Sequence, residues 1–122
     1  MITIMLVEDS IAVRTRVKEL ISELAQFRIV GEHDNAAAAI AAIQAQPPQV
    51  LLLDIKLKAS NGIEVMRFVH KNFPRTQVIV FSQHDDAEYR EQFTQAGAQF
   101  FLNKTTEPGK LRTTLADLAT SI

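Results

Sequence analysis

Three carboxylates, a hydroxyl and an ammonium group stand along the 122-residue chain, each one or two residues after a short apolar run. They belong to Glu8, Asp9, Asp54, Ser82 and Lys104. Carboxylates held within a few ångströms of one another repel, so either some become protonated or a divalent cation neutralises them. The chain has no cysteine, and a set of oxygen ligands suits Mg²⁺. A hard cation beside a lysine and a hydroxyl is also how protein sites handle a transferring phosphoryl group.

The acidic residues suit different parts of this chemistry. Asp54 stands alone after a central apolar run, so it is the candidate nucleophile that would become an aspartyl phosphate. The adjacent pair Glu8 and Asp9 suits a metal ion. For each residue taken singly, a plainer interpretation stays open, because acids at strand ends often cap the next helix. Ser82 could equally lie in a turn, and Lys104 could simply pair with an acid. Their common position after successive apolar runs favours one shared site.

Five apolar runs alternating with segments of helical period must position these residues. The runs are mostly uninterrupted, which is typical of strands covered on both faces, and they span residues 2–7, 28–30, 50–53, 78–81 and 100–102. Five helices are predicted between and after them, at residues 13–24, 35–46, 61–73, 85–97 and 111–122. Asn61 is the predicted cap of the third helix, Asp85 or Asp86 caps the fourth, and Gly97 ends it. This alternation predicts one α/β domain with a parallel sheet between two layers of helices.

Composition excludes several classes of protein. With 47% hydrophobic and 22% charged residues the chain is an ordinary globular one, and its formal charge of -1 gives no basic surface for nucleic acid. The absence of cysteine excludes disulfide scaffolds, thiol catalysis and cysteine–zinc sites. No apolar run approaches the ~18 residues of a membrane span. The first residues also lack the features of a secretory signal, so we expect a cytoplasmic location and no membrane partner.

Short motifs at characteristic spacings carry a family resemblance. They are LVEDS at 6–10, LLDI at 52–55 followed by Gly62, VFS at 80–82, AGA at 96–98 and FLNK at 101–104. Together they resemble the receiver domain of two-component response regulators, over the whole chain. The resemblance implies that residues 1–122 form one receiver domain. It also implies a flavodoxin-like, doubly wound, five-stranded parallel sheet in the order 2-1-3-4-5 with five helices.

The resemblance implies a role for each acid. Asp54 would accept a phosphoryl group from the phosphohistidine of a sensor histidine kinase or phosphotransfer protein, or from a small phosphodonor. The implied ligands of Mg²⁺ are Glu8, Asp9, Asp54 and the backbone carbonyl of Lys56. The chain would therefore be a phosphorylation-dependent signalling module rather than an enzyme that turns over a free substrate.

The resemblance also implies a conformational switch. Ser82 and Lys104 would bind the acquired phosphoryl oxygens, and movement of Ser82 would let Phe101 turn inward. That motion would reshape the face made by the fourth helix, fifth strand and fifth helix, where such domains dimerise or meet a protein target. Phosphate lifetime would be tuned, in a direction left open, by residues beside the path of the attacking water: Lys56, Gln83 and His84.

Two other functions stay open at this point. A receiver that keeps the fold but is never phosphorylated could act as an interaction domain; Gln83, where a small residue is more usual, and the altered loop after Asp54 motivate this alternative. The other is a Mg²⁺-dependent phosphohydrolase with an aspartyl nucleophile. Such enzymes usually need an acid two residues after the nucleophile, where Lys56 stands. The sequence does not decide between a stand-alone receiver and part of a longer regulator.

Overall fold

A five-stranded parallel sheet forms the centre of the computed structural model, which describes residues 1–84, 86–106 and 108–122. Its strands are β1 (Ile2–Val7), β2 (Phe27–His33), β3 (Val50–Leu53), β6 (Gln77–Ser82) and β7 (Phe100–Asn103). They lie in the order β2-β1-β3-β6-β7, with parallel pairing between all neighbours. Because β6 and β7 are the fourth and fifth strands of this sheet, the predicted order 2-1-3-4-5 is confirmed.

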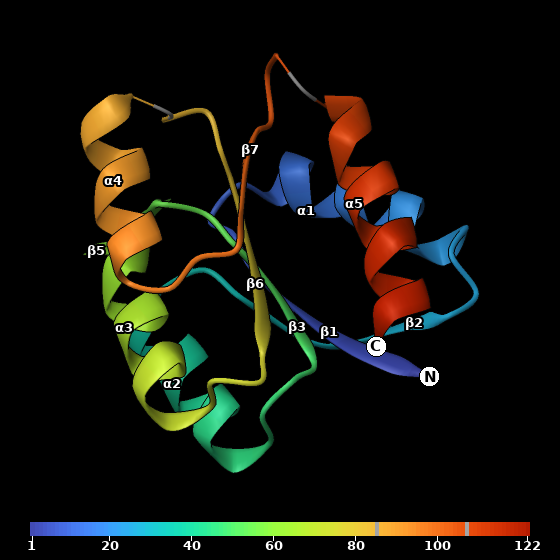
Figure 1. The fold of residues 1–122 in the computed structure, drawn as a ribbon, viewed down its shortest axis with the longest axis horizontal. Helices are drawn as coiled ribbons and strands as arrows, with labels where there is room; N and C mark the ends of the chain where they lie inside the picture. The colour runs from blue at the N-terminus through green and yellow to red at the C-terminus, as the bar shows by residue number, and fades with distance from the viewer. Residues whose placement is uncertain (85, 107) are drawn as a thin grey trace.

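Five helices cover the two faces of the sheet (Figure 1). They are α1 (Ile11–Ser22), α2 (Ala36–Ala45), α3 (Gly62–Asn72), α4 (Ala87–Gln95) and α5 (Pro108–Ser121). In Figure 1, α2, α3 and α4 lie on one side of the strands, and α1 and α5 lie on the other. Within the described residues, no helix combines the length and the apolar character needed to cross a membrane.

Two apolar cores sandwich the sheet, and alternate strand residues supply each of them. Met5 and Val7 join the core beneath α2, α3 and α4, whereas Ile4 and Leu6 join the core beneath α1 and α5. In β3, Leu51 and Leu53 face the first core and Leu52 faces the second. Burial on both faces explains why these strands are continuously hydrophobic in the sequence.

The structure corrects several predicted boundaries. The second strand was predicted over 28–30, but β2 runs to His33, and its register with β1 shifts between Ile4 and Met5. As an edge strand that is only partly buried, β2 carries polar residues that interrupt the apolar run. Ser82 is the last residue of β6 rather than the first residue after it. Ile122 lies beyond the end of α5 with 48% exposure, so it does not extend the buried face of that helix.

A short hairpin between β3 and α3 was not predicted. Its antiparallel strands are β4 (Lys56–Leu57) and β5 (Ser60–Asn61). Ala59 has a φ of 53°, and the Lys58 N–H donates to the Asp34 carbonyl oxygen at 2.9 Å. In tight hairpin turns, residues at such positions are usually asparagine or glycine. Because residue 59 is alanine, the sequence gives no turn signal here.

The helix ends follow from local hydrogen bonds. The Asn61 side chain accepts from the Ile63 N–H, and the Asp86 side chain accepts from the Tyr89 N–H, so both residues are N-caps as predicted. The alternative cap, Asp85, lies outside the described residues. Gly97, just past the end of α4, has a φ of 105°, as expected for a helix-ending glycine.

Gly62 brings the start of α3 against the end of β3. Its N–H donates to the Ile55 carbonyl oxygen at 2.7 Å. A Cβ at this position would lie 2.2 Å from the carbonyl oxygen of Asp54, which is too close for any side chain. The helix can therefore begin beside Asp54 only because residue 62 is glycine.

We expect Gly62→Ala to lower the free energy of unfolding by about 1–3 kcal/mol, because the new methyl group must displace backbone. Gly109→Ala is the matched control, since nothing lies within 4 Å of a Cβ there and alanine is the better helix former. That variant should be as stable as the wild type or more so by up to about 1 kcal/mol. Urea unfolding of the three proteins measures both effects, and equal stabilities for the two variants would contradict the packing argument.

Candidate functional site

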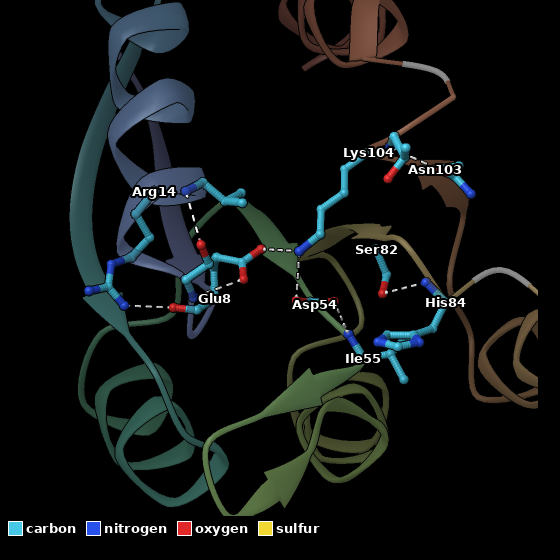
Figure 2. Close-up of polar contacts among 11 residues, drawn as sticks. Glu8, Arg14, Asp54, Ile55, Ser82, His84, Asn103 and Lys104 are labelled. Carbon is cyan, nitrogen blue, oxygen red and sulfur yellow. Dashed lines mark hydrogen bonds and ion pairs between the residues drawn. The ribbon is translucent and has the colours of Figure 1, made fainter.

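The carboxyl ends of four parallel strands bring the predicted site residues together (Figure 2). Glu8 follows β1, Asp54 follows β3 and Lys104 follows β7, while Ser82 ends β6. The ladders hold these ends level with one another, because Val7 pairs with Leu53 and Leu53 with Val80. The position of the acids, the hydroxyl and the lysine at one edge of the sheet thus follows from the strand register.

Lys104 joins the two buried acids. Its Nζ donates to Glu8 Oε1 at 2.9 Å and to Asp54 Oδ2 at 3.0 Å. The three side chains are only 13%, 7% and 5% exposed, respectively. The Lys104 backbone N–H donates to the Ser82 carbonyl oxygen at 3.2 Å, which fixes the start of the lysine side chain beside β6. One ammonium group therefore binds Glu8 and Asp54, which lie 96 and 50 positions before Lys104 in the chain.

The electrostatics of this cluster favour an added positive charge. Burial, followed by the charge of Asp54, raises the pKa of Glu8 to about 7, although hydrogen bonds from Lys104 and the Ser10 N–H oppose the shift. Burial alone would lower the pKa of Lys104, but its hydrogen bonds to Glu8 and Asp54 outweigh burial and raise that pKa. Lys104 is thus firmly cationic, and its charge only partly compensates the two carboxylates.

Asp9 completes a group of acids that can hold a divalent cation. One carboxylate oxygen from each of Glu8, Asp9 and Asp54 lies within 4.8 Å of the others. Glu8 and Asp54 are buried and Asp9 is exposed, so the group opens to solvent on one side. Hard oxygen donors at this spacing fit Mg²⁺, which usually binds one or two carboxylates and keeps several waters. The role of the Lys56 backbone carbonyl as a further ligand stays a prediction.

Two residues whose contacts with Glu8 were not predicted from the sequence hold Glu8 in place. Arg14 of α1 donates from Nη1 to the Glu8 carbonyl oxygen at 2.7 Å, and its Nε lies 3.6 Å from Glu32 Oε1 on β2. Ser10 donates its N–H to Glu8 Oε2 at 3.1 Å, and its Oγ caps α1 by accepting from the Val13 N–H. Ser10 carries a sequence signal as a helix cap, but the contact of Arg14 depends on the packing of α1 beside β2.

Asp54 and Ser82 present their oxygens differently. Asp54 Oδ1 accepts the Ile55 N–H at 2.7 Å, so each carboxylate oxygen has a donor. Ser82 is fully buried, and its Oγ accepts the His84 N–H at 3.2 Å (Figure 2). Gln83, between them in sequence, is exposed. The phosphoryl-binding role of Ser82 and the tuning role of Gln83 remain predictions.

Aromatic residues of α4 lie beside the remaining predicted residues. Lys56 Nζ lies 5.7 Å from the centroid of the Tyr89 ring, and the His84 ring packs edge-on against the same ring. Tyr89 is half-buried, and it packs against the apolar core as well as these two neighbours. Phe101 is half-buried too, with its ring centroid 6.3 Å from that of Phe93. The switch role of Phe101 stays a prediction.

Comparison with known proteins identifies the family. Residues 4–116 match the response regulator receiver domain family. The chain belongs to this family. It is 31% identical over 109 residues to the nitrate/nitrite response regulator protein NarL of Escherichia coli, covering 89% of this chain and 50% of that protein. It is 30% identical over 120 residues to the transcriptional regulatory protein UhpA of Salmonella typhimurium, covering 98% and 60%. The chain thus spans about half the length of the curated relatives it matches.

A solved structure supports the same assignment. The signal receiver domain of the response regulator NarL from Mycobacterium tuberculosis superimposes with a TM-score of 0.87 at 29% identity, covering 99% of this chain and 98% of that one. The resemblance that the motifs indicated is therefore confirmed. The chain is a receiver domain of the two-component signalling class.

The raised pKa of Glu8 makes the stability of the receiver domain depend on pH. Because the folded state holds the Glu8 proton more tightly, its contribution is complete below pH 4.5 and is lost as pH rises through about 7. Without a divalent cation, Glu8→Gln should therefore gain stability relative to the wild type between pH 5 and pH 8. We expect about 1–2 kcal/mol, allowing for screening at the solvent-facing edge.

Urea unfolding at pH 5 and pH 8 in a chelating buffer measures this difference. Glu19→Gln removes an exposed glutamate of α1 and is the matched control, which should follow the wild-type pH dependence. A constant difference between Glu8→Gln and the wild type across this range would contradict the proposed proton linkage.

Proposed function

We propose that residues 1–122 form one receiver domain that works as an active phosphorylation switch, with Asp54 as the phosphoacceptor. The observation that carries this proposal is the buried Asp54 carboxylate, 3.0 Å from the Lys104 ammonium group within a cluster of acids. In the transfer, an Asp54 oxygen bonds to phosphorus while the bond between phosphorus and the donor's histidine nitrogen breaks. The electron pair of that bond returns to the imidazole, so the donor histidine is restored.

The protein side chains assist this transfer by position and charge. The Ile55 N–H holds one Asp54 oxygen in place. Lys104 supplies a positive charge close to where the phosphoryl oxygens would lie. The Ser82 oxygen accepts the His84 N–H through a lone pair. The hydroxyl hydrogen of Ser82 can therefore be donated to a phosphoryl oxygen. These groups are already ordered, so little reorganisation is needed at the moment of transfer.

The proposal includes Mg²⁺ as cofactor. Its ligands would be Glu8, Asp9, Asp54 and the backbone carbonyl of Lys56, a set of hard oxygen donors that suits this ion. When bound, Mg²⁺ supplies charge neutralisation for the carboxylates and for the phosphoryl oxygens. The protein's part is to hold these oxygens close together against their mutual repulsion, and Lys104, Arg14 and Ser10 do so for Glu8.

The output of the switch would pass through Ser82 and Phe101 to the face of α4, β7 and α5. Phe101 sits half-buried on β7, with Phe93 against its edge and Arg90 Cζ 4.6 Å from its ring centroid. A rotation of Phe101 would change what this face offers to a second receiver or to a protein target. The donors would be a sensor histidine kinase or a phosphotransfer protein. The domain itself, with its charge of -1, would not bind nucleic acid.

The geometry favours this function over the two alternatives. An interaction domain that is never phosphorylated would have no use for a buried lysine bound to two buried acids. A phosphohydrolase would need an acid two residues after Asp54, where Lys56 stands with its ammonium group over the Tyr89 ring.

Phosphorylation tests the acceptor. Incubation with acetyl phosphate and Mg²⁺ should add one phosphoryl group to the wild type, read by intact mass, and none to Asp54→Asn. Asp117→Asn removes an exposed acid of α5 and should be phosphorylated like the wild type. A folded wild type that gains no mass from acetyl phosphate or from phosphohistidine donors would favour the interaction domain. Phosphate released from phosphate monoesters far beyond the amount of protein would favour the hydrolase.

Thermal unfolding tests the metal site. At pH 8, Mg²⁺ at a hundred times its dissociation constant should stabilise the wild type by about 2.7 kcal/mol, which raises Tm by roughly 5–10 °C. Asp9→Asn should lose most of this rise, and because Asp9 is exposed the variant should otherwise fold normally. Asp117→Asn should keep the full rise. Sodium chloride of equal ionic strength controls for screening, and an equal rise in all three proteins would contradict the assigned ligands.

A further inference from the structure

The ring of Tyr89 contacts side chains from two separate segments of the chain. Lys56 belongs to the β4–β5 hairpin and places its Nζ 5.7 Å from the ring centroid. His84 lies between β6 and α4, with its ring centroid 6.4 Å from that of Tyr89 and an interplanar angle of 67°. Tyr89 itself stands in the first turn of α4, where its N–H is held by the Asp86 cap. We call Lys56, His84 and Tyr89 the entrance cluster.

Two members of the entrance cluster lie in the segments that directly follow the site strands β3 and β6. Lys56 is two residues beyond Asp54 and begins the hairpin that follows β3. His84 is two residues beyond Ser82, and its N–H is bonded to the Ser82 hydroxyl (Figure 2). The two residues therefore belong to the segments that follow β3 and β6, and the Tyr89 ring connects them.

Both contacts are attractive and both use the aromatic ring. An ammonium group is drawn to the face of a ring, and an edge-on ring pair is the favoured geometry for two aromatic side chains. Tyr89 is half-buried and packs against the apolar core on the α4 side of the sheet, so its ring is better fixed than the exposed lysine chain. The ring therefore sets where the Lys56 ammonium group lies, rather than the reverse, and it supports the half-buried His84 ring from one side.

We propose that Tyr89 is a positioning residue that holds Lys56 and His84 across the entrance to Asp54 and thereby slows hydrolysis of the aspartyl phosphate. This inference rests on the proposed function. In the hydrolysis, a water oxygen bonds to phosphorus while the bond from phosphorus to the Asp54 oxygen breaks. The carboxylate is regenerated, and both water protons leave with the inorganic phosphate.

The direction of the effect follows from access. The attacking water must approach phosphorus from the side opposite the Asp54 oxygen. Side chains held together by an aromatic ring reduce the room for that water, and the same contacts keep Lys56 and His84 from turning to orient it. Loss of the ring should therefore open the approach and shorten the phosphate lifetime.

The decay of phosphorylated protein, followed by intact mass after removal of acetyl phosphate, measures this lifetime. Tyr89→Ala should shorten it roughly three- to tenfold, the size expected for the loss of contacts of this strength. Tyr89→Phe keeps the ring and should stay within about twofold of the wild type. Lys56→Ala, at an exposed position, should also shorten the lifetime. The double variant Lys56→Ala with Tyr89→Ala should decay no faster than Tyr89→Ala alone, because Lys56 acts through the ring.

Lys58→Ala is the matched control, since Lys58 is an exposed lysine of the same hairpin; it should keep the wild-type lifetime. Urea unfolding establishes that each variant is folded, and Lys56→Ala carries the test if Tyr89→Ala is not. An unchanged lifetime in Tyr89→Ala, equal acceleration in Tyr89→Phe, or additive effects of the two alanine changes would overturn the inference alone. A wild type that never gains a phosphoryl group would overturn the proposed function, and this inference with it.

Discussion

The interaction on which the site depends is the ammonium group of Lys104 between two buried carboxylates. Glu8 and Asp54 come from neighbouring strands, and without a positive charge between them their burial would be strongly unfavourable. Lys104 can reach both only because β7, β3 and β1 run parallel and end level with one another. Its charge leaves part of the acidic cluster uncompensated, as the raised pKa of Glu8 indicates. The same uncompensated negative charge that makes burial of the cluster unfavourable favours the binding of a cation.

The helix α4 connects this charged edge of the sheet to the protein surface. Its first turn carries Tyr89, which contacts residues beside the acceptor, and Arg90, which lies over the Phe101 ring. One turn further, Phe93 is fully buried against the edge of the same Phe101 ring. A small displacement of α4 would therefore move Tyr89 in the entrance cluster and Phe93 beside Phe101 at the same time. Because Phe93 is closely packed, such a displacement would take the helix from one discrete packing arrangement to another, without intermediate positions.

How far the sequence predicts this structure depends on whether the relevant signal is local. The bounds of β1 and β3 are predicted correctly, because burial on both faces makes these strands continuously apolar. The β4–β5 hairpin is missed because Ala59 adopts a positive φ without the usual turn residues. The convergence of the acids with Lys104 is predictable from strand ends alone. The contact of Arg14 with the Glu8 carbonyl oxygen is not, since it depends on how α1 packs beside β2.

The arrangement also separates the chemistry of the site from its tuning. Asp54 and Ser82 are buried at strand ends, so changing them disturbs the sheet edge as well as the reaction. The entrance cluster instead stands on the hairpin, on a loop and on the first turn of α4, and its members are exposed or half-buried. On the role that we propose for this cluster, substitutions there would change the access of water while Asp54 and Lys104 keep their geometry. On this proposal, a receiver would adopt a different phosphate lifetime without a different mechanism of phosphoryl transfer, because the entrance cluster lies on the hairpin, the loop and the helix rather than on the sheet.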